Sequence, residues 1–337
     1  MITFFMKYVK FFDFHPYILH SKNDRIVGGY CLICMNTQTN IDIELEGFGE
    51  YLEESKKKKP KLFDSYIGNA IKTFSLTVGL TYFLICLMYV CFQDSFLYKP
   101  SKKLERVPVH SGHSFMNLML KTSDNEKINA WFVPSGFNKG TVLYCRGNKG
   151  NLSNDLDVIE TWNKNGYNVM SFDYRGFGIS TGTPSEDGLY KDARAAYKWL
   201  KENHLTEKRF ILHGHSLGGG VASKLAVEVD CDGLILESTF TNLKDLTQMK
   251  FWALPSDIIC FSEFPTDQRL SAINAPVYII HSPEDRHIPF QMGQKLYRSA
   301  KEPKMFLTLQ DHDYDFPIYD RQYARSLASF ANSLERH

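Results

Sequence analysis

The stretch Arg209-Phe210-Ile211-Leu212-His213-Gly214-His215-Ser216-Leu217-Gly218-Gly219-Gly220 decides the fold. An apolar run leads into a Gly-x-Ser-x-Gly turn, and apolar residues then recur at helical spacing as far as Val229. A serine on a sharp strand-to-helix turn is the arrangement of a nucleophile elbow. Side chains two positions before and after the serine would collide with the neighbouring strand and helix, so glycine suits positions 214 and 218.

A glycine-rich turn between a strand and a helix can instead bind a phosphate group. The two patterns that mark such loops, Gly-x-Gly-x-x-Gly and Gly-Lys-Ser/Thr, are both absent from this turn. The central residue of the turn is a serine. The sequence therefore favours a nucleophile over a phosphate loop.

Composition narrows the class of protein further. The 337 residues are 43% hydrophobic and 23% charged, as in an ordinary globular protein. The 39 basic and 38 acidic residues nearly balance, which gives no nucleic-acid signature. Seven cysteines form no regular framework, and Cys31-x-x-Cys34 stands without a second pair at zinc spacing. We expect no metal, no cofactor and no nucleic-acid partner.

An N-terminal segment, residues 1–73, precedes the regular pattern. It mixes aromatic residues with scattered charge and ends in acidic and lysine-rich runs typical of a charged linker. The apolar run 26–35 is too short to span a bilayer. We expect a cytosolic segment, partly disordered or interfacial, and no cleaved signal peptide.

Residues 74–92 carry no formal charge. These 19 residues would reach about 28 Å as a helix, close to the roughly 30 Å thickness of the hydrocarbon layer. They predict a single transmembrane signal-anchor helix; a buried core helix is the alternative, because serine and threonine moderate the hydropathy. The lysines before this run outweigh the basic residues after it, which predicts a cytosolic N-terminus (type II) in an endomembrane or the plasma membrane.

From about residue 96 to the end, apolar runs alternate with helical patterns. Strands are predicted at 114–121, 128–133, 141–145, 167–172, 210–212, 233–236, 277–280 and 305–309, and helices at 155–165, 189–200, 221–229, 290–300 and 319–334. This alternation predicts an α/β fold over 96–337, with a mainly parallel sheet covered by helices on both faces. Thr183 and Glu186 have the spacing of a capping box before one helix.

The stretch 241–273 breaks the alternation. It is rich in large apolar residues, and it separates two predicted strands. We interpret it as a cap insertion over the active site, because a long interruption of this kind is usually a lid or a binding loop.

A serine nucleophile needs a base and a residue that orients the base. Asp285 follows the strand 277–280 and His312 follows the strand 305–309, the positions where a serine elbow finds its acid and base. Rivals of Asp285 are Glu284, His281 and His287; Asp311, Asp313 and Asp315 surround His312. His213 and His215 are interpreted as local contacts of the elbow. The predicted catalytic residues are Ser216, Asp285 and His312.

The oxyanion of the reaction needs hydrogen-bond donors. The N–H of Leu217 supplies the first, and the loop after strand 141–145 supplies the second, from Asn148 or else Lys149. Arg146 and Lys149 would make this rim electropositive, unless they are solvated surface charges. Asp173 and Arg175 follow another strand and are predicted to brace loops beside the site.

These motifs together resemble the α/β-hydrolase superfamily. The runs 174–178, 184–193 and 214–219 resemble the Bem-like membrane serine hydrolases, a group named α/β-hydrolase domain-containing protein 13, with the depalmitoylases numbered 17 in that series as cousins. The resemblance covers about residues 96–334 and the single anchor, and it implies Ser216, Asp285 and His312 as the triad. Relatives usually have His where this chain has Arg146.

The expected function is that of a membrane-anchored serine hydrolase. It would cleave an ester or thioester of a lipid or acylated substrate at the bilayer through an acyl-enzyme, as carboxylesterases, lipases and thioesterases do. A protein depalmitoylase is the specific alternative, and it requires a cytosolic catalytic domain. A non-catalytic membrane scaffold that keeps the fold is the alternative from another class.

Overall fold

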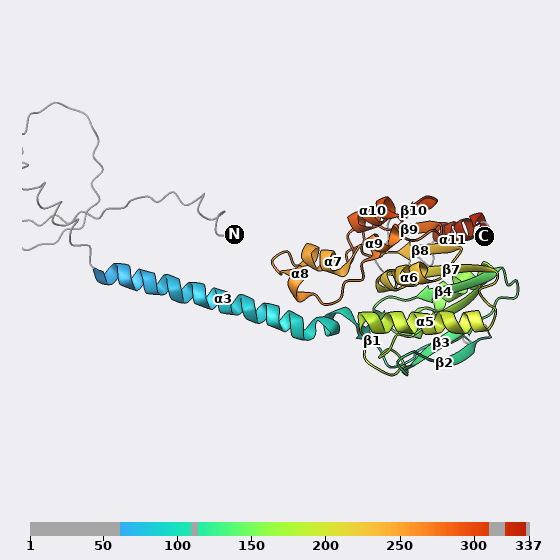
Figure 1. The fold of residues 1–337 in the computed structure, drawn as a ribbon, viewed down its shortest axis with the longest axis horizontal. Coiled ribbons are helices and arrows are strands. Elements are labelled where there is room, and N and C mark those ends of the chain that lie inside the picture. Colours follow the sequence, from blue (N-terminus) through green and yellow to red (C-terminus); the bar gives the residue numbers. More distant parts are fainter. Residues whose placement is uncertain (1–60, 109–113, 310–320, 335–337) are drawn as a thin grey trace, which may run out of the picture. The chain divides into compact units, whose positions relative to one another are not determined.

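The computed structural model describes residues 61–108, 114–309 and 321–334. The chain divides into two units, Met1–Lys72 and Thr73–His337. Helix α3 (Lys61–Leu97) begins in the first unit and ends in the second (Figure 1). It contains the predicted span 74–92. Its stretch Ser65–Leu97 contains an 18-residue window of mean hydropathy 2.0 and is long and apolar enough to cross a membrane by length and composition.

An eight-stranded sheet forms the centre of the second unit. Its strand order is β10-β9-β8-β7-β4-β6-β3-β2. The strands are β2 (Met116–Lys121), β3 (Lys127–Val133), β4 (Gly140–Cys145), β6 (Asn168–Phe172), β7 (Arg209–His215), β8 (Gly233–Glu237), β9 (Val277–His281) and β10 (Lys304–Thr308). All neighbours run parallel except β2 with β3 and β3 with β6. The predicted mainly parallel sheet is confirmed, and β2 and β3 form an antiparallel hairpin.

Helices cover both faces of the sheet. The main helices are α4 (Leu156–Lys164), α5 (Glu186–Glu202), α6 (Leu217–Glu228), α10 (Phe290–Ser299) and α11 (Arg321–Ser333). Because side chains alternate along a strand, Leu212 joins a core cluster with α5, α6 and α10, whereas Ile211 joins a second cluster with α4 and α11. The predicted α/β fold is therefore confirmed.

The start of α5 differs from the prediction. Ser185, and not Thr183, is the N-cap, and its hydroxyl accepts a hydrogen bond from the N–H of Gly188. Glu186 accepts hydrogen bonds from the N–H groups of Glu263 and Phe264. The carboxylate expected in a capping box therefore fixes the distant segment near residue 264.

The segment predicted as a cap contains three short helices. They are α7 (Leu243–Lys250), α8 (Ser256–Ile259) and α9 (Thr266–Leu270), between strands β8 and β9. Two very short strands, β1 (Lys99–Pro100) and β5 (Lys149–Gly150), pair in parallel beside the main sheet, and a 3-10 turn, η2 (Leu152–Asn154), follows β5. The pairing of β1 with β5 joins the end of α3 to the loop after β4.

Candidate active site

Ser216 occupies a strained turn between β7 and α6. Its φ is 53° and its ψ is −119°, a backbone conformation that residues other than glycine rarely adopt. A Cβ atom on Gly218 would lie 1.9 Å from the carbonyl oxygen of Cys145, and one on Gly214 would lie 2.4 Å from that of Gly218. The glycines at these two positions are therefore required, as the sequence predicts for a nucleophile elbow.

The end of β8 holds the elbow from the side. The N–H of Ser216 donates to the carbonyl of Glu237 at 2.9 Å, and the hydroxyl of Thr239 donates to the carbonyl of Ser216 at 2.6 Å. Backbone strain persists only where the surroundings determine it. These bonds fix the turn on both sides of the serine.

A buried polar network lies behind the elbow. The indole N–H of Trp162 donates to Nδ1 of His213 at 3.1 Å, so Nε2 carries the proton and donates to Glu237 at 2.9 Å. The hydroxyl of Tyr323 donates to the same carboxylate at 2.7 Å. Burial lowers the pKa of His215. His213 is thus engaged locally, as predicted.

Asp285 lies in the loop after β9, where the catalytic acid is predicted. Its Oδ1 accepts hydrogen bonds from the N–H groups of His287 and Ile288, both at 2.8 Å. Its Oδ2 is buried and accepts no hydrogen bond from the described residues. The rival Glu284 is exposed and accepts from the hydroxyl of Ser282. The geometry favours Asp285 as a fixed acceptor for an imidazole N–H.

Two histidines, His281 and His287, flank Asp285 in the sequence, and they differ in position. His281 is buried and donates from Nε2 to the carbonyl of Ile288 at 2.9 Å; the same Nε2 lies 3.5 Å from Oδ2 of Asp285, and His281 does not line the pocket described below. His287 does line it. The predicted base His312 and the nearby residues 311, 313 and 315 lie outside the described residues. The chain leaves β10 beside the end of β9, since Leu309 N–H donates to the carbonyl of His281.

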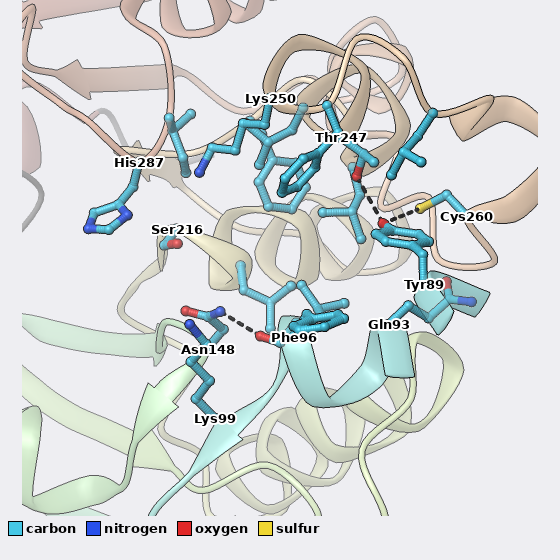
Figure 2. A pocket seen from close by; sticks show the side chains of 18 of the residues that line it. Tyr89, Gln93, Phe96, Lys99, Asn148, Ser216, Thr247, Lys250, Cys260 and His287 are labelled. Atoms are coloured by element: carbon cyan, nitrogen blue, oxygen red, sulfur yellow. Dashed lines mark hydrogen bonds between the residues drawn. The ribbon is translucent and has the colours of Figure 1, made fainter. Parts of the chain in front are cut away.

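A pocket of about 690 Å³ reaches Ser216. Its size falls within the range of roughly 300–1,000 Å³ that is usual for ligand sites. Figure 2 shows side chains from α3, from the cap and from the loop after β4 around it. The lining residues are Ile85, Met88, Tyr89, Gln93, Phe96, Leu97, Lys99, Asn148, Lys149, Ser216, Leu217, Phe240, Leu243, Leu246, Thr247, Lys250, Phe251, Leu254, Cys260, His287 and Ile288. Most are apolar, so the pocket suits an acyl chain.

The loop after β4 brings the predicted oxyanion donors to this pocket. Asn148, its alternative Lys149, and Leu217 all line the pocket together with Ser216. The side-chain amide of Asn148 donates to the backbone carbonyl of Leu97 at 2.5 Å. The backbone carbonyl of Asn148 accepts from the N–H of Lys99 at 2.8 Å. The loop is therefore held directly by the end of α3.

Arg146 does not contribute to the rim of the pocket, contrary to one expectation from the sequence. It is buried, its Nε donates to Asp155 at 3.1 Å, and its Nη1 lies 3.4 Å from Asp173. It also donates to the carbonyls of Lys149 and Asn151, both in the loop after β4. Arg146 thus fixes the shape of that loop from inside.

Asp173 completes this buried cluster. Its Oδ1 accepts from the N–H of Leu152 at 3.0 Å. Burial, together with the charge of Asp155, raises its pKa to about 7 against the opposing charge of Arg146. The predicted bracing role of Asp173 agrees with these contacts.

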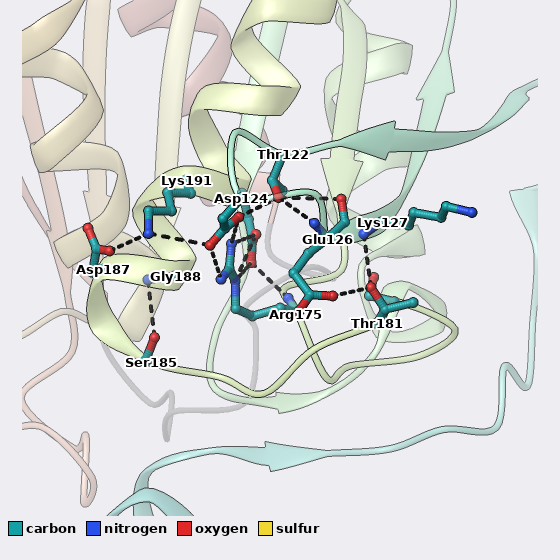
Figure 3. A network of polar contacts seen from close by, with 12 residues as sticks. Thr122, Asp124, Glu126, Lys127, Arg175, Thr181, Ser185, Asp187, Gly188 and Lys191 are labelled. Carbon is teal, nitrogen blue, oxygen red and sulfur yellow. Dashed lines mark hydrogen bonds and ion pairs between the residues drawn. The ribbon is translucent and has the colours of Figure 1, made fainter.

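Arg175 braces a second loop (Figure 3). Its guanidinium pairs with Asp124 in the β2–β3 turn and with Asp192 in α5, each at 2.9 Å. Burial raises the pKa of Asp192 to about 6, although hydrogen bonds from Arg175 oppose this. Lys191 also contacts Asp124, at 3.3 Å. The segment after β6 is thereby tied to the hairpin, as predicted.

The charged side chains that line the pocket are all positive among the residues that the structure describes. Lys99, Lys149 and Lys250 line it, and no carboxylate does among the residues that the structure describes. None of these three lysines forms an ion pair within the same described ranges. Partial burial lowers the pKa of Lys250; the negative charge of Asp285 opposes this shift, and the positive charge of Lys99 adds to it. Figure 2 shows the ends of Lys250 and Lys99 near Ser216.

The sequence predicts α3 only as an anchor, and its part in the pocket is not predicted. A signal was present, because Tyr82, Tyr89 and Gln93 are spaced seven and four residues apart in an otherwise apolar helix. Such spacing places them on one face of a helix. Lys250 was also missed, since nothing in the sequence marks which cap residues face inward.

Three comparisons with known proteins bear on this site. The family model described as serine aminopeptidase, S33, matches residues 137–257. An uncharacterized protein of Mycobacterium tuberculosis is 32% identical over 217 residues, covering 62% of this chain and 77% of that protein. The lysophosphatidylserine lipase ABHD12 of Danio rerio is 36% identical over 196 residues, covering 52% of this chain and 50% of that protein.

Among solved structures, an esterase of Pyrococcus furiosus has a similar fold. Its TM-score is 0.59 at 24% identity, over 70% of this chain and 99% of the esterase. This likeness agrees with the α/β fold described above. The chain belongs to the α/β-hydrolase superfamily.

Proposed function

We propose that the protein is a membrane-anchored serine hydrolase that cleaves the acyl ester of a lipid through an acyl-enzyme. The observation that carries this proposal is the largely apolar pocket that reaches the strained Ser216. Nucleophile and acyl site are thereby brought together, as acyl transfer requires. The names of two relatives, a lipase and an esterase, support the same chemistry.

The proposed reaction uses Ser216, His312 and Asp285. The hydroxyl of Ser216 attacks the ester carbonyl while His312 takes its proton, and Asp285 orients the imidazole and stabilises its positive charge. The N–H groups of Leu217 and Asn148 donate to the oxyanion. When the intermediate collapses, His312 returns the proton to the leaving alcohol, and water then releases the fatty acid by the same steps.

The pocket favours an anionic lipid. Its long apolar part suits an acyl chain, and Lys99, Lys149 and Lys250 supply positive charge near the serine. A charged headgroup gains most from cations that lack a carboxylate partner. One relative is named a lysophosphatidylserine lipase, which is consistent with a phosphate-bearing, single-chain substrate.

The proposal places the substrate at a membrane. The stretch 73–93 of α3 is uncharged and would span about 31 Å, close to the roughly 30 Å hydrocarbon layer. The excess of lysine before it supports a cytosolic N-terminus and a catalytic unit in the lumen or outside. Protease protection on sealed microsomes tests this orientation; digestion of the catalytic unit from the cytosolic side would contradict it.

The test of the activity uses the full chain in proteoliposomes. We expect a fluorophosphonate probe to label the protein and to leave Ser216→Ala unlabelled, and we expect release of fatty acid from a lysophospholipid to depend on the same residue. An acyl thioester presented on a peptide is tested in parallel. Preferential cleavage of the thioester would indicate a depalmitoylase, and activity that persists in Ser216→Ala would contradict the assignment.

A further inference from the structure

One face of α3 forms part of the pocket wall. Ile85, Met88, Tyr89, Gln93 and Phe96 all line the pocket that reaches Ser216. Their spacing of three or four residues is that of one helix face. The helix is therefore a component of the substrate site as well as a candidate membrane span.

Specific hydrogen bonds hold the cap against this face. The hydroxyl of Tyr89 lies 3.2 Å from that of Thr247 in α7, and Gln93 is buried with its amide bonded to two backbone groups of the cap. Its Nε2 donates to the carbonyl of Ile259 at 3.3 Å, and its Oε1 accepts from the N–H of Phe261 at 3.0 Å (Figure 2 shows Tyr89 and Gln93). The contact is built from complementary groups.

A fourth bond reaches further along α3. The hydroxyl of Tyr82 donates to the carbonyl of Ala253 at 2.7 Å. Tyr82 is twelve residues before Asp94, which corresponds to about 18 Å along the helix. If the uncharged stretch 73–93 lies in the hydrocarbon layer, as proposed above, the cap segment bonded to Tyr82 lies in that layer too.

The surface of the cap fits such a position. Its exposed large apolar side chains cluster between α7 and the segment after α8, where Gln248, Lys250 and Asp257 are also exposed; the apolar ones are Met249, Phe251, Trp252, Ile258 and Phe261. Backbone groups inside a bilayer need internal partners. The carbonyls of Ala253 and Ile259 and the N–H of Phe261 receive theirs from α3, and the carbonyl of Trp252 receives one from the amide of Gln248.

The pocket is open along α3. Ile85 and Met88 line it, yet they are 46% and 52% exposed. Ile85 is nine residues, about 14 Å, before Asp94 along the helix. An acyl chain at that depth would meet the opening without crossing water, so its methylene groups would not have to be exposed to water during entry.

We propose that this face of α3 is a wall of the acyl-chain site and that the site opens sideways into the bilayer, so that a single-chain lipid enters tail first from the membrane. The inference rests on the proposed function. It adds the direction of entry and the residues that contact the far end of the chain.

Chain-length selectivity tests the wall. In Met88→Trp a larger side chain fills the pocket, so we expect kcat/KM for a sixteen-carbon lysolipid to fall at least ~10-fold relative to that for an eight-carbon analogue. Met88→Ala should shift the preference toward longer chains. Leu84→Trp is the matched control, because Leu84 is equally exposed at 52% but does not line the pocket. Equal shifts in Met88→Trp and Leu84→Trp would overturn the inference.

Cross-linking gives an independent measurement on the unaltered chain. A fluorophosphonate with a long alkyl chain and a terminal diazirine is attached to Ser216 in proteoliposomes and then irradiated. We expect cross-links to α3 near Ile85 and Met88; cross-links confined to the sheet and α10 would refute the proposed wall. Absence of attachment to Ser216 would contradict the proposed function itself, and the inference with it.

Fluorescence tests the bilayer position of the cap. Trp252 is 73% exposed. Lipids brominated on the acyl chain should quench part of the emission, and Trp252→Phe should remove that part. Emission from Trp252 that is quenched by aqueous iodide and not by brominated lipid would place the cap in water and overturn sideways entry.

Discussion

The side-chain amide of Asn148 donates a 2.5 Å hydrogen bond to the carbonyl of Leu97, the last residue of α3. Asn148 belongs to the loop that carries a proposed oxyanion donor, and Leu97 ends the proposed membrane helix. The pairing of β1 with β5 continues this link over the next residues. The geometry of the proposed oxyanion loop therefore depends on the end of the proposed membrane helix.

Asn148→Ala tests this dependence. The backbone N–H of residue 148 remains, but its position is no longer fixed by Leu97, so we expect kcat to fall about tenfold or more with little change in KM. Asn203→Ala is a control, since its amide likewise bonds one carbonyl, that of Trp199, at an exposed site. A change in KM alone would show that Asn148 serves substrate binding instead.

The identity of the base is tested by two histidine variants. Because a triad member acts in every turnover, His312→Ala should lower kcat by about 10⁴-fold or more. His287 lines the pocket, but it is the backbone N–H of His287 that donates to Asp285. Because alanine keeps that N–H, we expect His287→Ala to retain activity within about tenfold. Fluorophosphonate labelling rates provide the measurement, and the reverse order of effects would make His287 the base.

The lysines of the pocket predict selectivity by charge. In Lys250→Ala, we expect KM for an anionic lysophospholipid to rise about tenfold, whereas KM for an uncharged monoacylglycerol of equal chain length stays the same. Lys99→Ala should act in the same direction. Lys198→Ala, an exposed lysine of α5, is the control. Equal effects on both lipids would argue against a headgroup role.

Asp173 predicts a dependence of stability on pH. Its pKa is about 7 in the folded protein, above the value of about 3.9 for an unfolded chain, so the folded state binds more protons between these values. Stability contributed by protonated Asp173 is complete below about pH 4 and is lost as the pH rises toward 7, by at most about 1.4 kcal/mol per pH unit.

Asp173→Asn removes this proton but keeps an oxygen that accepts from Leu152 N–H. The melting temperature of the variant should therefore decline less than that of the wild type between pH 4 and 7. Ser180→Ala, which removes a hydroxyl bonded to the carbonyl of residue 173, controls for local loosening. Parallel curves for wild type and Asp173→Asn would show that Asp173 is ionised throughout.

The sequence predicts local features well because they depend on nearby residues. The turn at Ser216, the strands around it and the position of Asp285 follow from apolar periodicity and from glycines with a steric role. The predicted N-cap at Thr183 is wrong for a different reason, because it depends on a distant segment. Glu186 is used by Glu263 and Phe264, so a contact across 77 residues overrides the local pattern.

Contacts between distant segments could not be read from the chain. Arg146 looks like a surface charge until Asp155 and Asp173 are placed around it, and the polar face of α3 has no meaning before the cap is packed against it. The base His312 lies outside the described residues, so its assignment remains a prediction.

The short β1–β5 pair has a practical consequence for producing the enzyme. A chain that starts after Pro100, chosen to obtain a soluble protein, would lack β1, the carbonyl that receives the Asn148 amide, and six residues of the pocket wall from Ile85 to Leu97. The segment removed together with the proposed anchor would therefore include part of the candidate active site. A truncation between the proposed anchor and the α/β-hydrolase unit would cut through that site.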